Sequence, residues 1–397
     1  MTRYLLSLMA AGVGLMWALW PGSALSHETV KTSVTFDREI SRIVSRRCIT
    51  CHSDANLAFP LTTYEETRPW AQAIEEEVLS RQMPPWRAVA GYGKFANDGG
   101  LTTRELQTIV AWVQGNGPKS PDQTVIVNID QSRTPQNLRL KTDFDRWQLG
   151  RPDLIRPVAA NAVERSQPGA AIRTVVDLEM KVDRRIRGLE FRPGDRRVLR
   201  AAFFWLEASG QWLGSWTPWH GATSLPNDAA YLVPGGSRVV AELHYQGAAA
   251  AVQDAGQLGV YYAAGAPAHC PSDLVLRTEG NVAPHATNQK FQAVTALTAD
   301  TTLLALIPAL PEGARSLEVR ARKPDGTVGV LLLVRDVLHD WPTPYIFDTP
   351  VRLPKGTELS ATSYYRNASD EARGGGVDVR VSGFTESACS PQRPERS

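Results

Sequence analysis

The sequence predicts a multidomain protein of the α plus all-β class, in which a small helical domain precedes two antiparallel β-sandwiches. Three observations predict this class. Apolar residues recur at helical spacing between residues 34 and 117. A polar, proline-bearing linker begins at Pro118, and beyond it apolar and polar residues alternate with a period of two. The chain, at 397 residues, is long enough for two or three domains.

The first 26 residues have the features of an export signal. Arg3 supplies a positive start, residues 4–20 are an almost uncharged apolar run, and residues 24–26 place small side chains at a cleavage site. The alternative is an uncleaved membrane anchor, but the apolar run is short for a hydrocarbon layer of roughly 30 Å. We therefore expect periplasmic localisation, a mature chain that begins at His27, and no stable membrane span after cleavage.

Three short helices are predicted in the helical domain. The first places apolar residues on one face directly before Cys48. The second covers about residues 64–81. The third begins with a capping box formed by Thr102 and Glu105, and it stops at the glycine- and proline-bearing residues 115–118.

Beyond the linker, turns of the Pro-Gly and Pro-Asp-Gly type separate runs with strand periodicity. The predicted strands are residues 173–182, 186–192, 198–206, 237–246, 257–264, 290–297, 315–322, 328–334, 357–365 and 376–383. Many short strands at this spacing are typical of sandwiches or barrels. An interruption near residues 265–284 divides them. The predicted segments are a signal (1–26), a helical domain (27–120) and two sandwiches (121–265 and 266–397).

The charge balance excludes one class of partner. Lysine and arginine number 43 and aspartate and glutamate 41, which gives a formal net charge of +2. A nearly neutral chain is not drawn as a whole to polyanions, so no nucleic-acid partner is expected. Seven arginines between Arg184 and Arg200 are either a docking patch for an acidic partner or the solvated face of alternating strands.

The chain has four cysteines. In an oxidising compartment, Cys270 and Cys389 are expected to form a disulfide bond. Cys48 and Cys51 belong instead to the motif Cys-Ile-Thr-Cys-His, which ends at His52. Zinc, a redox dithiol and a c-type haem are three hypotheses for this motif.

The surroundings of the motif favour haem. Zinc needs four ligands, and no second CxxC or HxxxH pair follows at finger-like spacing. A redox dithiol needs a βαβ setting, whereas this pair follows an amphipathic helix. C-x-x-C-H is the attachment signature of a c-type haem. The predicted cofactor is therefore a covalent haem c (heme c), held by Cys48, Cys51 and His52.

The methionines of the chain suggest a second axial ligand for the haem iron. Once the signal is removed, Met83 and Met180 are the two that remain. Met83 lies in the sequence Met-Pro-Pro-Trp, where two prolines hold the backbone extended, so we expect its thioether to bind the haem iron. The alternative is a packing methionine. A His/Met pair raises the reduction potential and leaves no open position for oxygen, which indicates an electron carrier.

Four stretches, "FDREISRIVSRRCITCH", "LTTYEETRPWAQAI", "MPPW" and "LTTRELQTIVAWVQGNGP", resemble the cytochrome c domains that bacteria fuse in front of copper type II monooxygenase-like domains. This resemblance implies that Cys48, Cys51 and His52 hold the haem and that Met83 is its distal ligand.

Downstream, "IRGLEFRPGDRRVLRAAFF" and "LVPGGSRVVAELHYQ" resemble the two jelly-roll sandwiches of peptidylglycine alpha-hydroxylating and dopamine beta-monooxygenases, over about residues 145 to 385. The resemblance implies two copper sites built from histidines and one methionine. His244 matches one ligand position, but Gln246 stands at the next, and residues 198–201 and 308–313 lack the remaining histidines. Copper is therefore not expected, with His244 the one candidate ligand.

These observations predict a periplasmic c-type cytochrome that carries single electrons to or from a redox partner protein. The sandwiches are expected to be a non-catalytic docking or ligand-binding module. The alternative is a copper-dependent monooxygenase that receives electrons from its own haem. A third hypothesis is a haem-bearing sensor or binding subunit of a larger complex.

Overall fold

The computed structural model describes residues 32–53, 58–120, 146–163, 171–246 and 252–385. The predicted export signal, His27 and Cys389 lie outside these residues. No helix in the described ranges is both long enough and apolar enough to cross a membrane.

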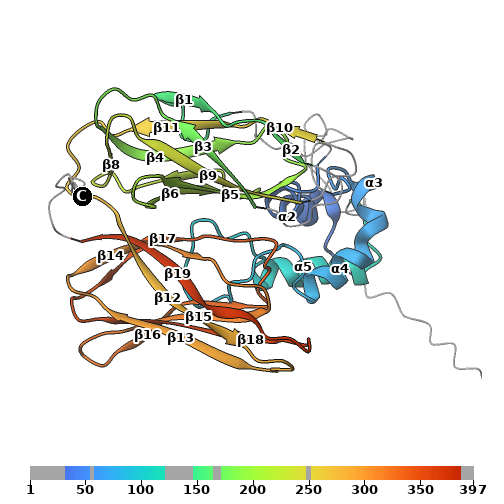
Figure 1. Ribbon diagram of the computed structural model, residues 1–397. Coiled ribbons are helices and arrows are strands. Elements are labelled where there is room, and N and C mark those ends of the chain that lie inside the picture. The colour runs from blue at the N-terminus through green and yellow to red at the C-terminus, as the bar shows by residue number, and fades with distance from the viewer. Residues whose placement is uncertain (1–31, 54–57, 121–145, 164–170, 247–251, 386–397) are drawn as a thin grey trace, which may run out of the picture.

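Antiparallel sheets dominate the fold and stack in layers (Figure 1). The outer sheet of the first sandwich has the order β1-β11-β4-β7, with β8 also paired to β4, and the inner sheet has the order β3-β9-β5-β6. The outer strands are β1 (Leu154–Pro157), β11 (Gln257–Tyr262), β4 (Arg184–Arg192), β7 (Ala222–Ser224) and β8 (Tyr231–Val233). The inner strands are β3 (Ala171–Asp177), β9 (Arg238–Tyr245), β5 (Leu199–Leu206) and β6 (Trp212–Trp216), while β2 (Asn161–Val163) and β10 (Val252–Asp254) pair separately.

The second sandwich is built from two four-stranded sheets. One has the order β12-β19-β14-β17 and the other the order β13-β18-β15-β16. The strands are β12 (Ser272–Val282), β13 (Gln289–Ala296), β14 (Thr301–Pro308), β15 (Ala314–Arg322), β16 (Val328–Arg335), β17 (Tyr345–Leu353), β18 (Glu358–Tyr365) and β19 (Arg373–Thr385).

The two sandwiches pack against each other through a third apolar cluster between their own cores. This cluster joins Phe203 of β5 and Trp212 of β6 to Ala305 and Ile307 of β14. Strands β6 and β14 are consequently covered on both faces, and all five residues of β6 are buried. The two sandwiches therefore share a buried interface.

The helices lie beside both sandwiches (Figure 1). They are a π-helical turn (Phe36–Ile40), α2 (Ser41–Arg47), α3 (Tyr64–Thr67), a 3-10 turn (Arg68–Trp70), α4 (Ala71–Leu79) and α5 (Thr103–Gln114). The predicted capping box is confirmed, because Thr102 accepts from the Glu105 amide while Glu105 accepts from the Thr102 amide. Trp112, fully buried, is at the centre of their small apolar core.

The predicted fold class is wrong in its helical part. We predicted a helical cytochrome c domain over residues 27–120, but the described residues are 44% strand and 13% helix and contain no sizeable helical domain. The longest helix in the described ranges, α5, has 12 residues. One physical reason is that part of this segment packs elsewhere: Trp86 and Phe95 are buried in the core of the second sandwich. Helical periodicity cannot show where the chain between helices packs.

The ten predicted strands are confirmed in position, each overlapping an observed strand. Within the described residues, nine further strands were missed: β1, β2, β6, β7, β8, β10, β12, β14 and β17. Strands β6 and β14 show continuous burial and no alternation, so a period of two could not reveal them. Strand β12 begins at Ser272, inside the stretch where the prediction placed an interruption.

Replacing Phe95 with alanine is expected to destabilise the second sandwich. Phe95 is 8% exposed and packs its ring 5.4 Å from Phe347 and 5.3 Å from Tyr345. Removing a buried phenyl ring typically costs about 3–5 kcal/mol of unfolding free energy. Urea unfolding of the variant measures the loss, with the exposed Tyr92→Ala as a control. A loss no larger than that of the control would show that residues 84–97 do not support this core.

Candidate functional site

The Cys-Ile-Thr-Cys-His motif forms a turn at the end of helix α2. Cys48 caps the helix through its amide, which donates to the Val44 carbonyl (2.9 Å). The amides of Cys51 (3.0 Å) and His52 (2.9 Å) both donate to the Cys48 carbonyl. Ile49, 1% exposed, anchors the turn in the helical core. The turn thus brings both cysteines and His52 to the wall of one cavity.

Both thiols are free, and both residues are half-buried. Burial raises the pKa of the Cys48 thiol to about 12, with the nearby Cys51 and Glu105 adding to the rise. Burial also raises the pKa of Cys51 to about 11, against the hydrogen bond from Thr50. A disulfide does not join the two, so each sulfur is available for another covalent bond.

His52 is oriented by a backbone carbonyl. Its Nδ1 lies 3.0 Å from the carbonyl oxygen of Phe59, and because that oxygen can only accept, Nδ1–H is the donor. Burial lowers the pKa of the ring and outweighs the opposing Phe59 hydrogen bond, which favours the neutral form. Nε2 is left with a lone pair, as an axial ligand requires. Phe59 is itself stacked on Trp70, at 4.1 Å between ring centroids.

Met83 lines the same cavity from the end of helix α4. Arg81, at a φ of 59°, turns the chain out of the helix, and the Met83 amide donates to the Glu77 carbonyl (3.1 Å). The side chain is 40% exposed, which is high for a methionine that only fills space in a core. The Met83 side chain is therefore partly accessible and borders the cavity that contains Cys48, Cys51 and His52.

The structure therefore brings the four predicted haem residues together around one cavity of about 520 Å³. Most of its wall is apolar and comes from the helical segment. Sequence reasoning missed its other wall, where the sandwiches contribute Arg200, Trp219, Gln246 and Trp341. Two free thiols, an imidazole nitrogen and a thioether around an apolar cavity form a donor set that fits a covalent haem.

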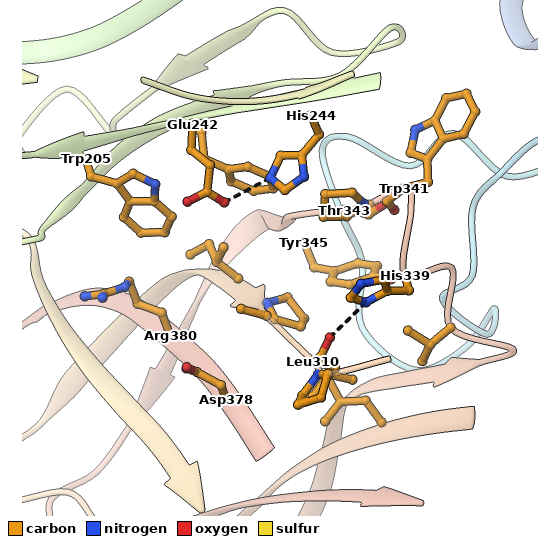
Figure 2. Close-up of a pocket in the computed structure, with 18 of the residues that line it drawn as sticks. Trp205, Glu242, His244, Leu310, His339, Trp341, Thr343, Tyr345, Asp378 and Arg380 are labelled. Atoms are coloured by element: carbon orange, nitrogen blue, oxygen red, sulfur yellow. Dashed lines mark hydrogen bonds and ion pairs between the residues drawn. The ribbon is translucent and has the colours of Figure 1, made fainter. Parts of the chain in front are cut away.

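A second cavity, of about 630 Å³, lies between the two sandwiches and contains the copper candidate His244 (Figure 2). His244 Nε2 lies 2.9 Å from Glu242 Oε1 on the same strand, β9. His339, from the loop after β16, faces the same cavity, with Nδ1 3.3 Å from the Leu310 carbonyl. Across the described ranges, no three His, Cys, Asp or Glu side chains gather as a metal-binding group.

Five of the arginines between Arg184 and Arg200 lie over aromatic rings. The guanidinium carbon to ring centroid distances are 5.3 Å for Arg184 on Tyr262, 5.4 Å for Arg187 on Tyr261, 5.1 Å for Arg192 on Trp147, 5.2 Å for Arg196 on Trp216 and 5.0 Å for Arg200 on Trp341. Such stacking holds the side chains along the sandwich surface. At these five positions, the arrangement favours a structural role over a docking patch.

The predicted disulfide stays a prediction. Cys270 borders a small cavity with Arg184 and Tyr262, but Cys389 lies outside the described residues.

Comparison with known proteins identifies no family. No family model matches the chain, and no curated protein matches it. Among solved structures, N-glycanase F (PNGase F) is similar over 58% of this chain and 97% of its own, at 8% identity and a TM-score of 0.27. Allantoicase from Saccharomyces cerevisiae is similar over 56% and 79%, at 9% identity and a TM-score of 0.21. At such TM-scores these likenesses carry no argument.

Proposed function

We propose that this protein is a periplasmic c-type haem protein that carries single electrons. The observation that carries the proposal is the convergence of Cys48, Cys51, His52 and Met83 on one apolar-walled cavity. These four residues are the ones that the sequence motifs single out. The resemblance of the motifs to bacterial cytochromes fused to monooxygenase-like domains supports the same function.

Each residue has a defined task. Cys48 and Cys51 would form the two thioether bonds, and the Phe59 carbonyl holds His52 so that Nε2 can bind iron. Met83, which lines the same cavity, would supply its thioether sulfur to the iron. A haem bound in this way supplies reversible one-electron chemistry between iron(II) and iron(III). The apolar wall limits the access of water, and the sandwiches that complete it would bind a ligand or dock the redox partner protein.

Covalent attachment is the first test. We expect the full-length protein, expressed with haem-attachment enzymes, to retain haem and iron on the chain after denaturation. The Cys48→Ser/Cys51→Ser double variant should lose all of it, because no thioether can form. Cys270→Ser is the matched control and should keep it. A wild-type chain that releases all its haem on denaturation would exclude the proposed attachment.

A second candidate function is a copper-dependent monooxygenase that receives electrons from its own haem. The observation in its favour is that His244 and His339 reach one cavity from opposite sandwiches. Metal analysis after copper loading decides between the two. Near-stoichiometric copper that is lost in His244→Ala would support the enzyme, whereas iron alone would support the electron carrier.

A further inference from the structure

Met83 lies in a short segment that connects helix α4 to the second sandwich. On the helical side, the Gln82 and Met83 amides both donate to the Glu77 carbonyl of α4, at 2.8 Å and 3.1 Å. On the other side, Trp86 is 9% exposed in the core of the second sandwich. The Val89 amide donates to a backbone carbonyl of β16 (2.8 Å). The segment is therefore anchored at both of its ends.

Arg87 folds back across this segment. Its Nη1 donates to the Arg81 carbonyl, and its Nη2 donates to the side-chain oxygen of Gln82 (3.0 Å). Among the hydrogen bonds of the described residues, only these two join residues 84–97 to residues 80–83. We call residues 81–87 the Met83 loop, and the Arg87 guanidinium closes it.

The Met83 loop begins with an unfavourable backbone conformation. Arg81 has a φ of 59°, in the left-handed region that costs free energy in most residues other than glycine. The Arg87 hydrogen bond to the carbonyl of this same residue involves a charged donor. Such a hydrogen bond is roughly twice as strong as one between neutral groups. Arg87 therefore stabilises the turn that leads into Met83.

The described structure gives the Arg87 side chain few other partners. The residue is 9% exposed, and its Nε is buried without a hydrogen-bond partner. Within the described ranges no carboxylate forms an ion pair with it, since Asp336, whose charge acts on Arg87, pairs with Arg315 (3.3 Å). Burial accordingly lowers the pKa of the guanidinium. Because a buried cation needs hydrogen-bond partners, Arg87 and the two oxygens of the Met83 loop stabilise each other.

We propose that Arg87 is a positioning residue for Met83. Its guanidinium keeps the Met83 loop closed, so that the thioether stays at the cavity that also contains His52. Because the adjacent Trp86 is buried in the second sandwich, that sandwich sets the position of the loop. The bond from Met83 to iron rests on the proposed function, whereas the closure of the loop does not.

Arg87→Met tests the proposal in the haem-loaded protein. The variant keeps an apolar stem but loses the charge and the donors, so the open form of the loop should become about tenfold more populated, which corresponds to about 1.4 kcal/mol. Carbon monoxide should then bind the reduced iron up to about tenfold more tightly than in the wild type. The absorption band of the iron(III)–thioether bond should weaken. Arg87→Lys keeps the charge but lacks the planar fork, so it should give an intermediate result.

Two controls separate the loop from general stability. Arg322→Met makes the same substitution at an exposed position of β15 and should behave as the wild type does. Val379→Ala removes apolar volume from the core of the second sandwich, where Val379 is fully buried, and leaves the Met83 loop intact. It should lower the thermal unfolding temperature but not change carbon monoxide affinity. Wild-type affinity and absorption in a folded Arg87→Met variant, or an equal change in Val379→Ala, would contradict the proposal.

A haem-free measurement separates this inference from the proposed function. In the Cys48→Ser/Cys51→Ser chain, hydrogen exchange at the Gln82 and Met83 amides reports the opening of the loop. Adding Arg87→Met should accelerate this exchange about tenfold and leave exchange in helix α5 unchanged. If the wild type attaches no haem, the proposed function fails and the exchange rate alone decides whether Arg87 closes the loop. An unchanged rate at these two amides would overturn the inference in either case.

Discussion

Met83→Leu is expected to open the haem iron to external ligands and to lower its reduction potential by on the order of 0.1 V. Leucine has nearly the volume of methionine, so the cavity wall is kept while the thioether sulfur is lost. In the wild type, carbon monoxide should bind poorly because both axial positions are filled. Absorption spectra with and without carbon monoxide, together with a potentiometric titration, measure both effects.

The chain offers a matched control for this change. Met180 is 6% exposed in the core of the first sandwich and does not line the cavity that contains Met83. Met180→Leu makes the same chemical substitution there and should leave the spectrum and the potential unchanged. If the wild type already binds carbon monoxide as freely as Met83→Leu does, Met83 is not a ligand.

Acid is expected to destabilise the first sandwich through His220. Burial lowers the pKa of this histidine from 6.5 to about 4, and a hydrogen bond to the Ala222 backbone offsets only part of the shift. The unfolded chain therefore takes up a proton before the folded chain does. The stabilisation is complete above about pH 6.5 and is lost as the pH falls toward about 4. The loss amounts to about 3 kcal/mol.

Urea unfolding at a series of pH values tests this expectation. His220→Gln removes the titrating group, so its unfolding free energy should fall less steeply between pH 6.5 and about 4 than that of the wild type. His285 has a side chain that is 68% exposed, and His285→Gln should keep the wild-type slope. Parallel curves for the wild type and His220→Gln would remove His220 as the cause.

The local elements could be predicted because their signals are local. The capping box at Thr102 needs only residues three positions apart, and the alternating strands each show one buried face. The same holds for the Cys-Ile-Thr-Cys-His motif, since spacing along the chain specifies the haem hypothesis. Strands β6 and β14 were not predicted because each is covered on its other face by the neighbouring sandwich. No local sequence pattern reveals such a contact.

The sequence by itself singled out the residues that we propose hold a haem, and it located about half of the strands, because covalent spacing and side-chain periodicity belong to neighbouring residues. It did not determine the fold class of the helical segment, since the burial of Phe95 in the second sandwich depends on contacts about 250 residues away along the chain, such as Phe347. Only the tertiary structure decided that the sandwiches complete the cavity around Cys48, Cys51 and His52 and enclose a second one. Both cavities are spaces between packed layers, and Trp341 lines the two because it lies where those layers meet.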